Sequence, residues 1–105
     1  MLTQNAVIKK VRNYAKEINK SGVNLRKVIL FGSYAKGTQH EWSDIDVALV
    51  ADNFTGVCFL DKKLFPYIGI KEPYIGIEPR TYSTDYFLES DPFIEEIKKT
   101  GIEII

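Results

Sequence analysis

The stretch from Val28 to Val50 reads Val-Ile-Leu-Phe-Gly-Ser-Tyr-Ala-Lys-Gly-Thr-Gln-His-Glu-Trp-Ser-Asp-Ile-Asp-Val-Ala-Leu-Val. Its first apolar run stops at a Gly-Ser pair, a stretch of small and polar residues follows, and a second apolar run carries Asp44 and Asp46. Apolar runs bounded by turn residues are typical of strands. The stretch therefore predicts two strands joined by a loop.

Asp44 and Asp46 are two residues apart, and on a strand that spacing places both side chains on the same face. At roughly 5 Å and an effective dielectric near 20, two carboxylates repel each other by about 3 kcal/mol. A divalent cation between them removes that repulsion, and paired carboxylates are a common way to hold Mg²⁺ next to phosphates. We therefore expect Mg²⁺ at this pair.

Gly32 and Ser33 end the first strand in a way that suits a phosphate. Glycine lets backbone N–H groups approach a ligand closely, and a neighbouring hydroxyl can bind a phosphate oxygen. Lys36 adds a cation to the same loop. Together with the carboxylate pair, these residues predict a nucleoside triphosphate held through its metal, beside a site for phosphoryl or nucleotidyl transfer.

The pattern Gly32-Ser33-x-Ala35-x-Gly37, with ten residues between Ser33 and Asp44 and then Ser43-Asp44-x-Asp46, resembles the signature of the minimal nucleotidyltransferase family of the DNA polymerase beta superfamily. The resemblance covers about fifteen positions, which makes it far more specific than a lone glycine motif. One departure is Lys36, where many relatives carry Arg. The charge is kept, but the bidentate fork for phosphate is lost.

The resemblance implies a Mg²⁺-dependent transfer of AMP from ATP, although the residues do not identify the nucleotide. It places the metal on Asp44 and Asp46. It also places the nucleotide against the small and polar residues of the motif, which are Gly32, Ser33, Lys36 and Ser43.

Relatives of this family carry a third carboxylate on a neighbouring strand, where it completes the metal site and acts as base. Glu72 and Glu78 compete for that role. Glu78 is favoured because it follows the strand-like run Tyr-Ile-Gly-Ile, and Pro79 directly after it implies an edge strand or a bend.

Short members of this family resemble the antitoxin of a pair with a HEPN-type toxin, which they modify by adenylylation of a hydroxyl. This resemblance implies a partner toxin as the acceptor. A small-molecule acceptor of the aminoglycoside type and a non-catalytic partner-binding module are the alternatives. The oligomeric state stays open, with self-association among the options.

Composition narrows the class of protein further. The chain has 105 residues, of which 45% are hydrophobic, so we expect one domain over residues 1–105 with a single core. Fourteen basic and fourteen acidic residues give no net charge, which disfavours general nucleic-acid binding. One cysteine allows no internal disulfide, and charges interrupt every apolar run. We expect a cytoplasmic protein that does not enter a membrane.

The remaining segments predict an α+β fold of the polymerase-beta-like nucleotidyltransferase kind, with a mixed sheet and helices packed on one side. Apolar spacing and caps predict helices over residues 3–20, 33–36, 56–67 and 92–100, and strands over residues 25–31, 44–51, 74–78 and 102–105.

Overall fold

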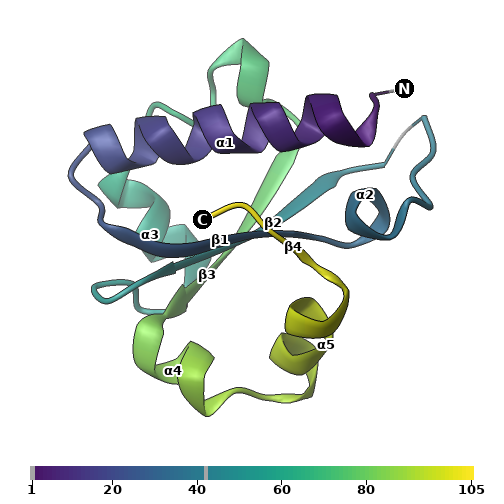
Figure 1. The fold of residues 1–105 in the computed structure, drawn as a ribbon. Coiled ribbons are helices and arrows are strands. Elements are labelled where there is room, and N and C mark those ends of the chain that lie inside the picture. The colour runs from purple at the N-terminus through teal and green to yellow at the C-terminus, as the bar shows by residue number, and fades with distance from the viewer. Residues whose placement is uncertain (1, 42) are drawn as a thin grey trace.

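The computed structural model describes residues 2–41 and 43–105 and shows a four-stranded mixed sheet with helices around it (Figure 1). The strand order is β3-β2-β1-β4, in which β1 runs antiparallel to β2 and β4 whereas β2 and β3 are parallel. The predicted α+β class with a mixed sheet is confirmed. The elements in chain order are α1 (Gln4–Lys20), β1 (Leu25–Phe31), α2 (Ser33–Lys36), β2 (Ile45–Ala51), α3 (Cys58–Asp61), η1 (Lys62–Leu64), η2 (Glu72–Tyr74), β3 (Ile77–Ser83), α4 (Thr84–Glu89), α5 (Pro92–Thr100) and β4 (Ile102–Glu103).

Helix α1 follows directly from its sequence. The Thr3 hydroxyl accepts a hydrogen bond from the Ala6 N–H at 3.1 Å, which caps the first turn. Gly22 adopts a φ of 104° just past the end of the helix, where a side chain would be strained. The apolar stripe that predicted this helix is buried against the sheet and consists of Val7, Val11, Tyr14, Ala15 and Ile18.

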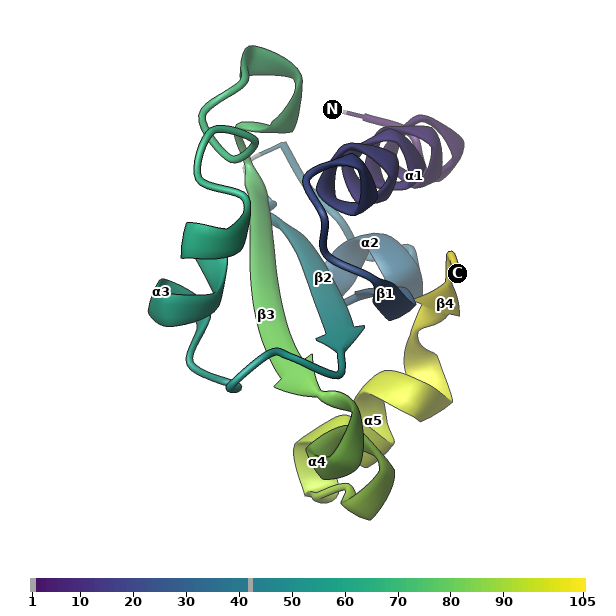
Figure 2. The same ribbon diagram turned by 90° about the vertical axis from the view of Figure 1, so that its left-hand side faces the viewer.

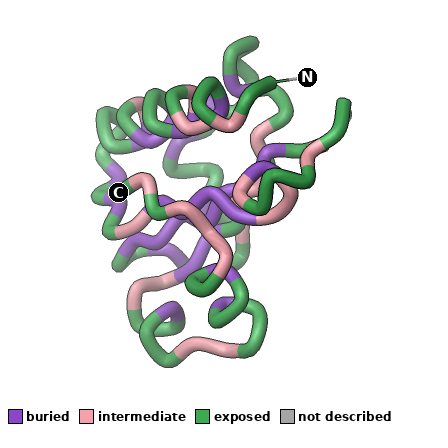
Figure 3. Tube along the Cα trace, turned by 45° about the vertical axis from the view of Figure 1, so that its right-hand side comes forward, coloured by how far each residue is buried: buried purple, intermediate pink, exposed green. Residues whose placement is uncertain are grey.

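Helices cover both faces of the sheet, which corrects the expectation that they pack on one side. Figure 1 shows α1 above the sheet and α4 and α5 below it, and Figure 2 shows the same separation from the side. On one face, Val28 and Leu30 join the α1 cluster; on the other, Ile29 packs with residues of α4 and α5. The reason lies in the central strands, whose apolar runs are continuous rather than alternating, because both of their faces are buried (Figure 3).

The helix predicted over residues 56–67 is much shorter than expected. Only α3 is α-helical, and η1 continues it as a single 3₁₀ turn. Asp61, which ends α3, is 2% exposed, and its carboxylate accepts hydrogen bonds from the Thr55 N–H, the Gly56 N–H and the Thr81 hydroxyl at 2.8, 3.0 and 2.6 Å. These bonds tie the loop before α3 to β3.

Strand β3 begins later than the sequence predicted. The first residues of the expected strand belong to η2 and the turn after it, and Tyr74 packs against Tyr14 with ring centroids 5.4 Å apart. Regular pairing with β2 starts at Ile77. Burial of the Tyr74 ring against α1 therefore outweighs the local strand pattern.

Side chains cap the first turns of both C-terminal helices. The Ser83 hydroxyl accepts from the Tyr86 N–H at 3.1 Å, and the Asp91 carboxylate accepts from the Ile94 N–H at 2.7 Å. Pro92 occupies the first turn of α5, which suits proline because that N–H needs no helical partner. Among the described residues, no helix has the length and apolar character to cross a membrane.

Candidate active site

The turn between β1 and α2 brings the backbone against an acidic side chain. Gly32 has φ 75° and ψ −152°, a conformation that is essentially restricted to glycine. A Cβ at this position would collide with the Asp46 carboxylate. Position 32 therefore favours glycine for two reasons: its backbone conformation disfavours any side chain, and the Asp46 carboxylate occupies the space that a Cβ would need.

Helix α2 is held in place from α1. The Gln4 side-chain amide donates to the Tyr34 and Ala35 carbonyl oxygens at 2.9 and 3.3 Å. The last carbonyls of a helix lack helical partners, so this amide supplies a bond that a four-residue helix otherwise lacks. Sequence reasoning did not identify Gln4, because thirty residues separate it from the motif.

Ser33 and Lys36 lie at the two ends of α2. Ser33 is the first residue after Gly32 and is partly buried. Lys36 lies at the other end, where its ammonium forms an ion pair with Glu96 of α5 at 3.6 Å. Both side chains of that pair are about half exposed, so the pair is weak and easily exchanged for a ligand.

Ser43 has a local role in the loop before β2. Its hydroxyl accepts from the His40 N–H at 2.8 Å, and its own N–H donates to the His40 carbonyl at 3.0 Å. This reciprocal pair closes the loop just before the acidic residues. The motif serine therefore shapes the chain that leads into Asp44.

The structure brings Asp46 and Glu78 together from neighbouring strands. They are register partners in the parallel pairing of β2 and β3, and β3 is an edge strand, as Pro79 implied. Glu72 lies instead in η2, ahead of β3. Of the two glutamates that the sequence left in competition, Glu78 is thus the one beside Asp46.

Asp44 departs from its predicted place. The strand was expected to begin there, but β2 begins at Ile45 and Asp44 is exposed in the preceding loop. The Ile45 N–H already bonds to the Gly76 carbonyl at 3.0 Å, so the pairing starts one residue after Asp44. The pleat of β2 therefore determines from which face of the sheet the Asp46 side chain projects, but it does not determine the direction of the Asp44 side chain.

Electrostatics nevertheless couple the three carboxylates. Burial, followed by the negative charges of Glu78 and Asp44, raises the pKa of the Asp46 carboxyl above its usual range, while Arg80 acts in the opposite direction. Within residues 2–41 and 43–105, no group of three or more His, Cys, Asp or Glu side chains is placed so that it could hold a metal ion as the chain stands. Carboxylate oxygens are the donors that a hard divalent cation prefers.

Two further side chains lie at this face and were not predicted from the sequence. Arg80 follows Glu78 by two residues on β3, so both side chains project from the same face. Phe93, from α5, lies edge-on to Phe31 with ring centroids 5.8 Å apart. The alternation of β3 could have indicated Arg80, but nothing in the sequence links Phe93 to β1.

A groove of about 590 Å³ opens beside Arg80, with Tyr82, Tyr86 and Phe93 in its wall. The rings of Tyr82 and Tyr86 are stacked within 2° of parallel. The groove follows β3 from Arg80 to Ser83, at the start of α4. It is large enough for several side chains of a bound partner.

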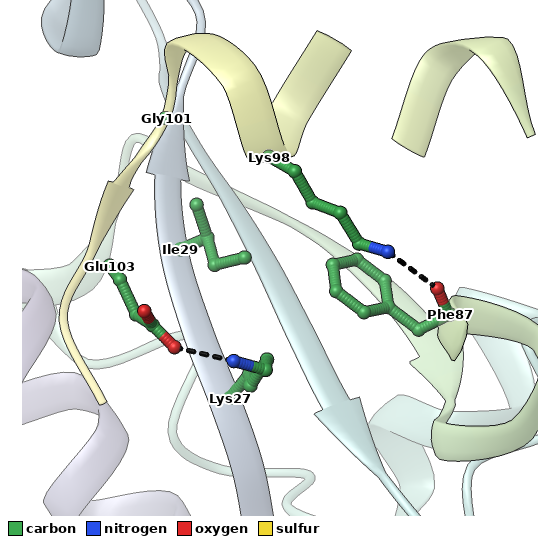
Figure 4. Close-up of a pocket in the computed structure, with 6 residues that line it drawn as sticks. All are labelled: Lys27, Ile29, Phe87, Lys98, Gly101 and Glu103. Carbon is green, nitrogen blue, oxygen red and sulfur yellow. Dashed lines mark hydrogen bonds and ion pairs between the residues drawn. The ribbon is translucent and has the colours of Figure 1, made fainter. Parts of the chain in front are cut away.

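A smaller pocket on the β4 side of β1 shares no lining residue with this groove. Figure 4 shows its walls, formed by β1, β4, α4 and α5. Lys27 is paired with Glu103 at 2.7 Å, and Lys98 donates to the Phe87 carbonyl at 3.2 Å. Both lysines of this pocket therefore have partners within the chain.

The fold is that of a nucleotidyltransferase. The model of the nucleotidyltransferase domain family matches residues 8–104, and the chain belongs to that family. The predicted family and the assignment as an enzyme of this class are confirmed.

Curated relatives carry related names. The candidate protein adenylyltransferase MJ0141 of Methanocaldococcus jannaschii is 33% identical over 90 residues, which cover 76% of this chain and 79% of that relative. The protein adenylyltransferase MntA of Shewanella oneidensis is 42% identical over 50 residues, which cover 48% of this chain but 31% of MntA.

Two solved structures share the fold. A candidate nucleotidyltransferase from Sulfolobus solfataricus matches 95% of this chain and 80% of its own, with a TM-score of 0.67 and 20% identity. A toxin–antitoxin structure with AMP-PNP matches 90% of this chain and 72% of its own, with a TM-score of 0.62 and 20% identity. At this identity they establish the arrangement of the elements.

Proposed function

We propose that this chain transfers AMP from ATP to a hydroxyl group of a partner protein, with Mg²⁺ as the cofactor. The observation that carries the proposal is the junction of Gly32, in the turn after β1, with Asp46 on β2 and Glu78 on β3. A phosphate loop, a half-buried carboxylate and a second carboxylate in register with it are the parts that nucleotidyl transfer requires.

The first half of the proposed site binds the terminal phosphates. Gly32 leaves the backbone open to a ligand, and the Ser33 hydroxyl is the nearest donor after it. Lys36 would exchange its exposed partner Glu96 for a phosphate oxygen. Ser43 contributes through the loop that it closes, which places the start of β2 beside this turn.

Asp44, Asp46 and Glu78 would hold Mg²⁺, which, when bound, neutralises charge on the phosphate oxygens. Burial, and after it the charges of Glu78 and Asp44, raises the pKa of the Asp46 carboxyl, and a bound cation would offset both effects. Asp44 is exposed and not fixed by the strand, so it can move toward a ligand.

The order of the strands indicates the side from which the acceptor approaches. The phosphate loop follows β1, Asp46 lies on β2 and Glu78 lies on β3. In an in-line displacement the attacking and leaving oxygens lie on opposite sides of the phosphorus. Because pyrophosphate leaves on the β1 side, the acceptor comes from the β3 side, where the groove beside Arg80 opens.

The proposed step assigns each proton and bond. Glu78 takes the proton of the acceptor hydroxyl, whose oxygen forms a bond to the α-phosphorus of ATP. The bond between the α-phosphorus and the bridging oxygen breaks, and that electron pair leaves with pyrophosphate. The products are the adenylylated acceptor and pyrophosphate.

The partner we propose is a toxin of the HEPN type, which this chain would neutralise as its antitoxin. Relatives named as protein adenylyltransferases support a protein acceptor, and the toxin–antitoxin neighbour with AMP-PNP supports this setting. The HEPN class rests on the resemblance of the Gly32–Asp46 motif.

The test incubates the protein with ATP labelled on the α-phosphate, Mg²⁺ and the protein encoded by the adjacent gene. We expect label on the partner, and its loss in Asp46→Asn, with the exposed Asp85→Asn as a matched control. Neutralisation of the partner without label, equal in wild type and Asp46→Asn, would instead identify a non-catalytic binding module.

A further inference from the structure

Arg80 is a cation placed at the border between the carboxylates and the groove. Its register partner on β2 is Ala48, two residues after Asp46. At a rise of about 3.3 Å per residue, its Cα lies about 7 Å along the strand from that of Glu78, on the same face. An arginine side chain easily spans that distance, so its guanidinium can reach a group bound between Asp46 and Glu78.

An aromatic pair orients the guanidinium. The Arg80 guanidinium carbon lies 4.8 Å from the centre of the Phe93 ring, in the geometry of a cation–π contact. Phe93 in turn meets Phe31 at an interplanar angle of 88°. Since Phe31 is the register partner of Asp46 and directly precedes Gly32, the two rings connect the phosphate loop to Arg80.

Arg80 differs from Lys36, the cation of the motif, in having no carboxylate among the described residues paired with it. Lys36 is paired with Glu96, whereas no carboxylate of the described part of the chain forms an ion pair with Arg80. A guanidinium without an acidic partner, beside an acidic cluster, is suited to an anionic ligand that bridges the two.

We propose that Arg80 binds the α-phosphate of the nucleotide, with Phe93 as the residue that positions it. This inference rests on the proposed function and adds a residue that acts on the reacting phosphorus itself. The terminal phosphates are held on the β1 side, but Arg80 lies on β3, beyond Asp46. The planar fork of arginine can donate two parallel hydrogen bonds to one phosphate, which lysine cannot.

A comparison of the affinities for ATP and for AMP distinguishes contacts to the α-phosphate from contacts to the terminal phosphates. In the presence of Mg²⁺, we expect Arg80→Ala to lower the affinity for ATP and the affinity for AMP by a similar factor of about ten to one hundred, because both nucleotides contain the α-phosphate. Arg80→Lys should fall between wild type and Arg80→Ala. Ser33→Ala should weaken ATP more than AMP, since AMP lacks the phosphates that Ser33 would hold.

Two further variants separate positioning from folding. Phe93→Leu keeps an apolar side chain on α5 but removes the ring under the guanidinium, and we expect a loss of about three- to ten-fold for both nucleotides. Arg12→Ala removes the same charge from the exposed face of α1 and should bind both as wild type does. Thermal unfolding of each variant identifies any loss that comes from the fold.

The outcomes are distinct. If wild type binds ATP and Arg80→Ala binds both nucleotides equally well, the inference fails while the proposed function stands. A loss confined to ATP would move the contact to the terminal phosphates and also overturn it. If wild type binds no ATP in the presence of Mg²⁺, both the proposed function and this inference fall.

Discussion

The two sides of the candidate site are built in different ways. The β1 side comes from one contiguous stretch, in which a turn and a loop join Gly32 to Asp46 within fifteen residues. The β3 side is assembled by the fold, which brings Glu78 and Arg80 from an edge strand and Phe93 from α5. We infer that the first side holds the terminal phosphates and that the second surrounds the α-phosphorus and the acceptor.

Glu78→Gln should have the largest effect, and it tests whether the β3 side supplies the chemistry while the β1 side binds the terminal phosphates. We expect the rate of AMP transfer to fall by about 10²- to 10³-fold, the usual contribution of a general base. The affinity for ATP should change far less, because the β1 side keeps its phosphate contacts. Glu72→Gln, in η2, is the matched control and should transfer AMP near the wild-type rate. Equal losses in both variants would contradict the assignment of Glu78.

Gly32→Ala should remove the contribution of the β1 side. Its Cβ would collide with the Asp46 carboxylate in a backbone conformation that disfavours any side chain, at a cost of about 1–3 kcal/mol in stability. We expect ATP affinity to fall by about 100-fold, measured by calorimetric titration.

Gly22→Ala provides the control for this substitution. Gly22 also has a positive φ, but no atom lies within 4 Å of the position that an added methyl group would take, so it isolates backbone strain from collision. It should lose stability and keep its ATP affinity. An ATP affinity that falls equally in both variants would show that strain alone, and not the contact with Asp46, accounts for the loss.

Asp61 bonds the loop before α3 to β3, so its replacement should lower the stability of the fold rather than the rate of AMP transfer by the folded protein. Asp61→Asn should reduce the free energy of unfolding by about 2–3 kcal/mol, because the four donors of Thr55, Gly56 and Thr81 lose a buried carboxylate. Burial opposes the charge of Asp61, but the hydrogen bonds from Thr55, Thr81 and Gly56 outweigh it and lower its pKa.

The sign of the pH dependence follows from that lowered pKa. The contribution of Asp61 is fully present above the usual pKa of an aspartate, near about 4, and is lost as the pH falls through its lower value in the folded state. Chemical unfolding of wild type, Asp61→Asn and the exposed Asp85→Asn at neutral and acid pH measures this. A difference between wild type and Asp61→Asn that does not shrink toward acid pH would count against the assignment.

Gln4→Ala gives the smallest expected effect on the β1 side. Loss of the amide that bonds to the Tyr34 and Ala35 carbonyls should loosen α2 and weaken ATP binding by about two- to ten-fold. Asn13→Ala, on the exposed face of α1, is the control. If the two variants bind ATP equally, α2 does not depend on α1 for its position.

The contiguous side was predictable from sequence because its signals are local. Glycines, a hydroxyl and aspartates at fixed spacing identified the turn, α2 and β2, although the strand begins one residue after Asp44. The stripe of α1 was equally clear, since its period is that of a helix.

The assembled side was predictable only in part. Glu78 came from the resemblance, but Arg80 and Phe93 become neighbours only through the pairing of β3 and the packing of α5. The same limitation explains the expectation of helices on one side. The continuous apolar runs of β1 and β2 were interpreted only as strands, and nothing in the sequence shows that α4 and α5 fold back over their second face.

Asp46 joins the two sides, so the most direct test is the Mg²⁺ dependence of ATP binding in wild type and in Asp46→Asn. We predict that wild type binds ATP much more tightly with Mg²⁺ than without it, and that Asp46→Asn loses most of this difference while remaining folded. An Asp46→Asn variant with the wild-type affinity and the wild-type response to Mg²⁺ would contradict a metal site centred on Asp46.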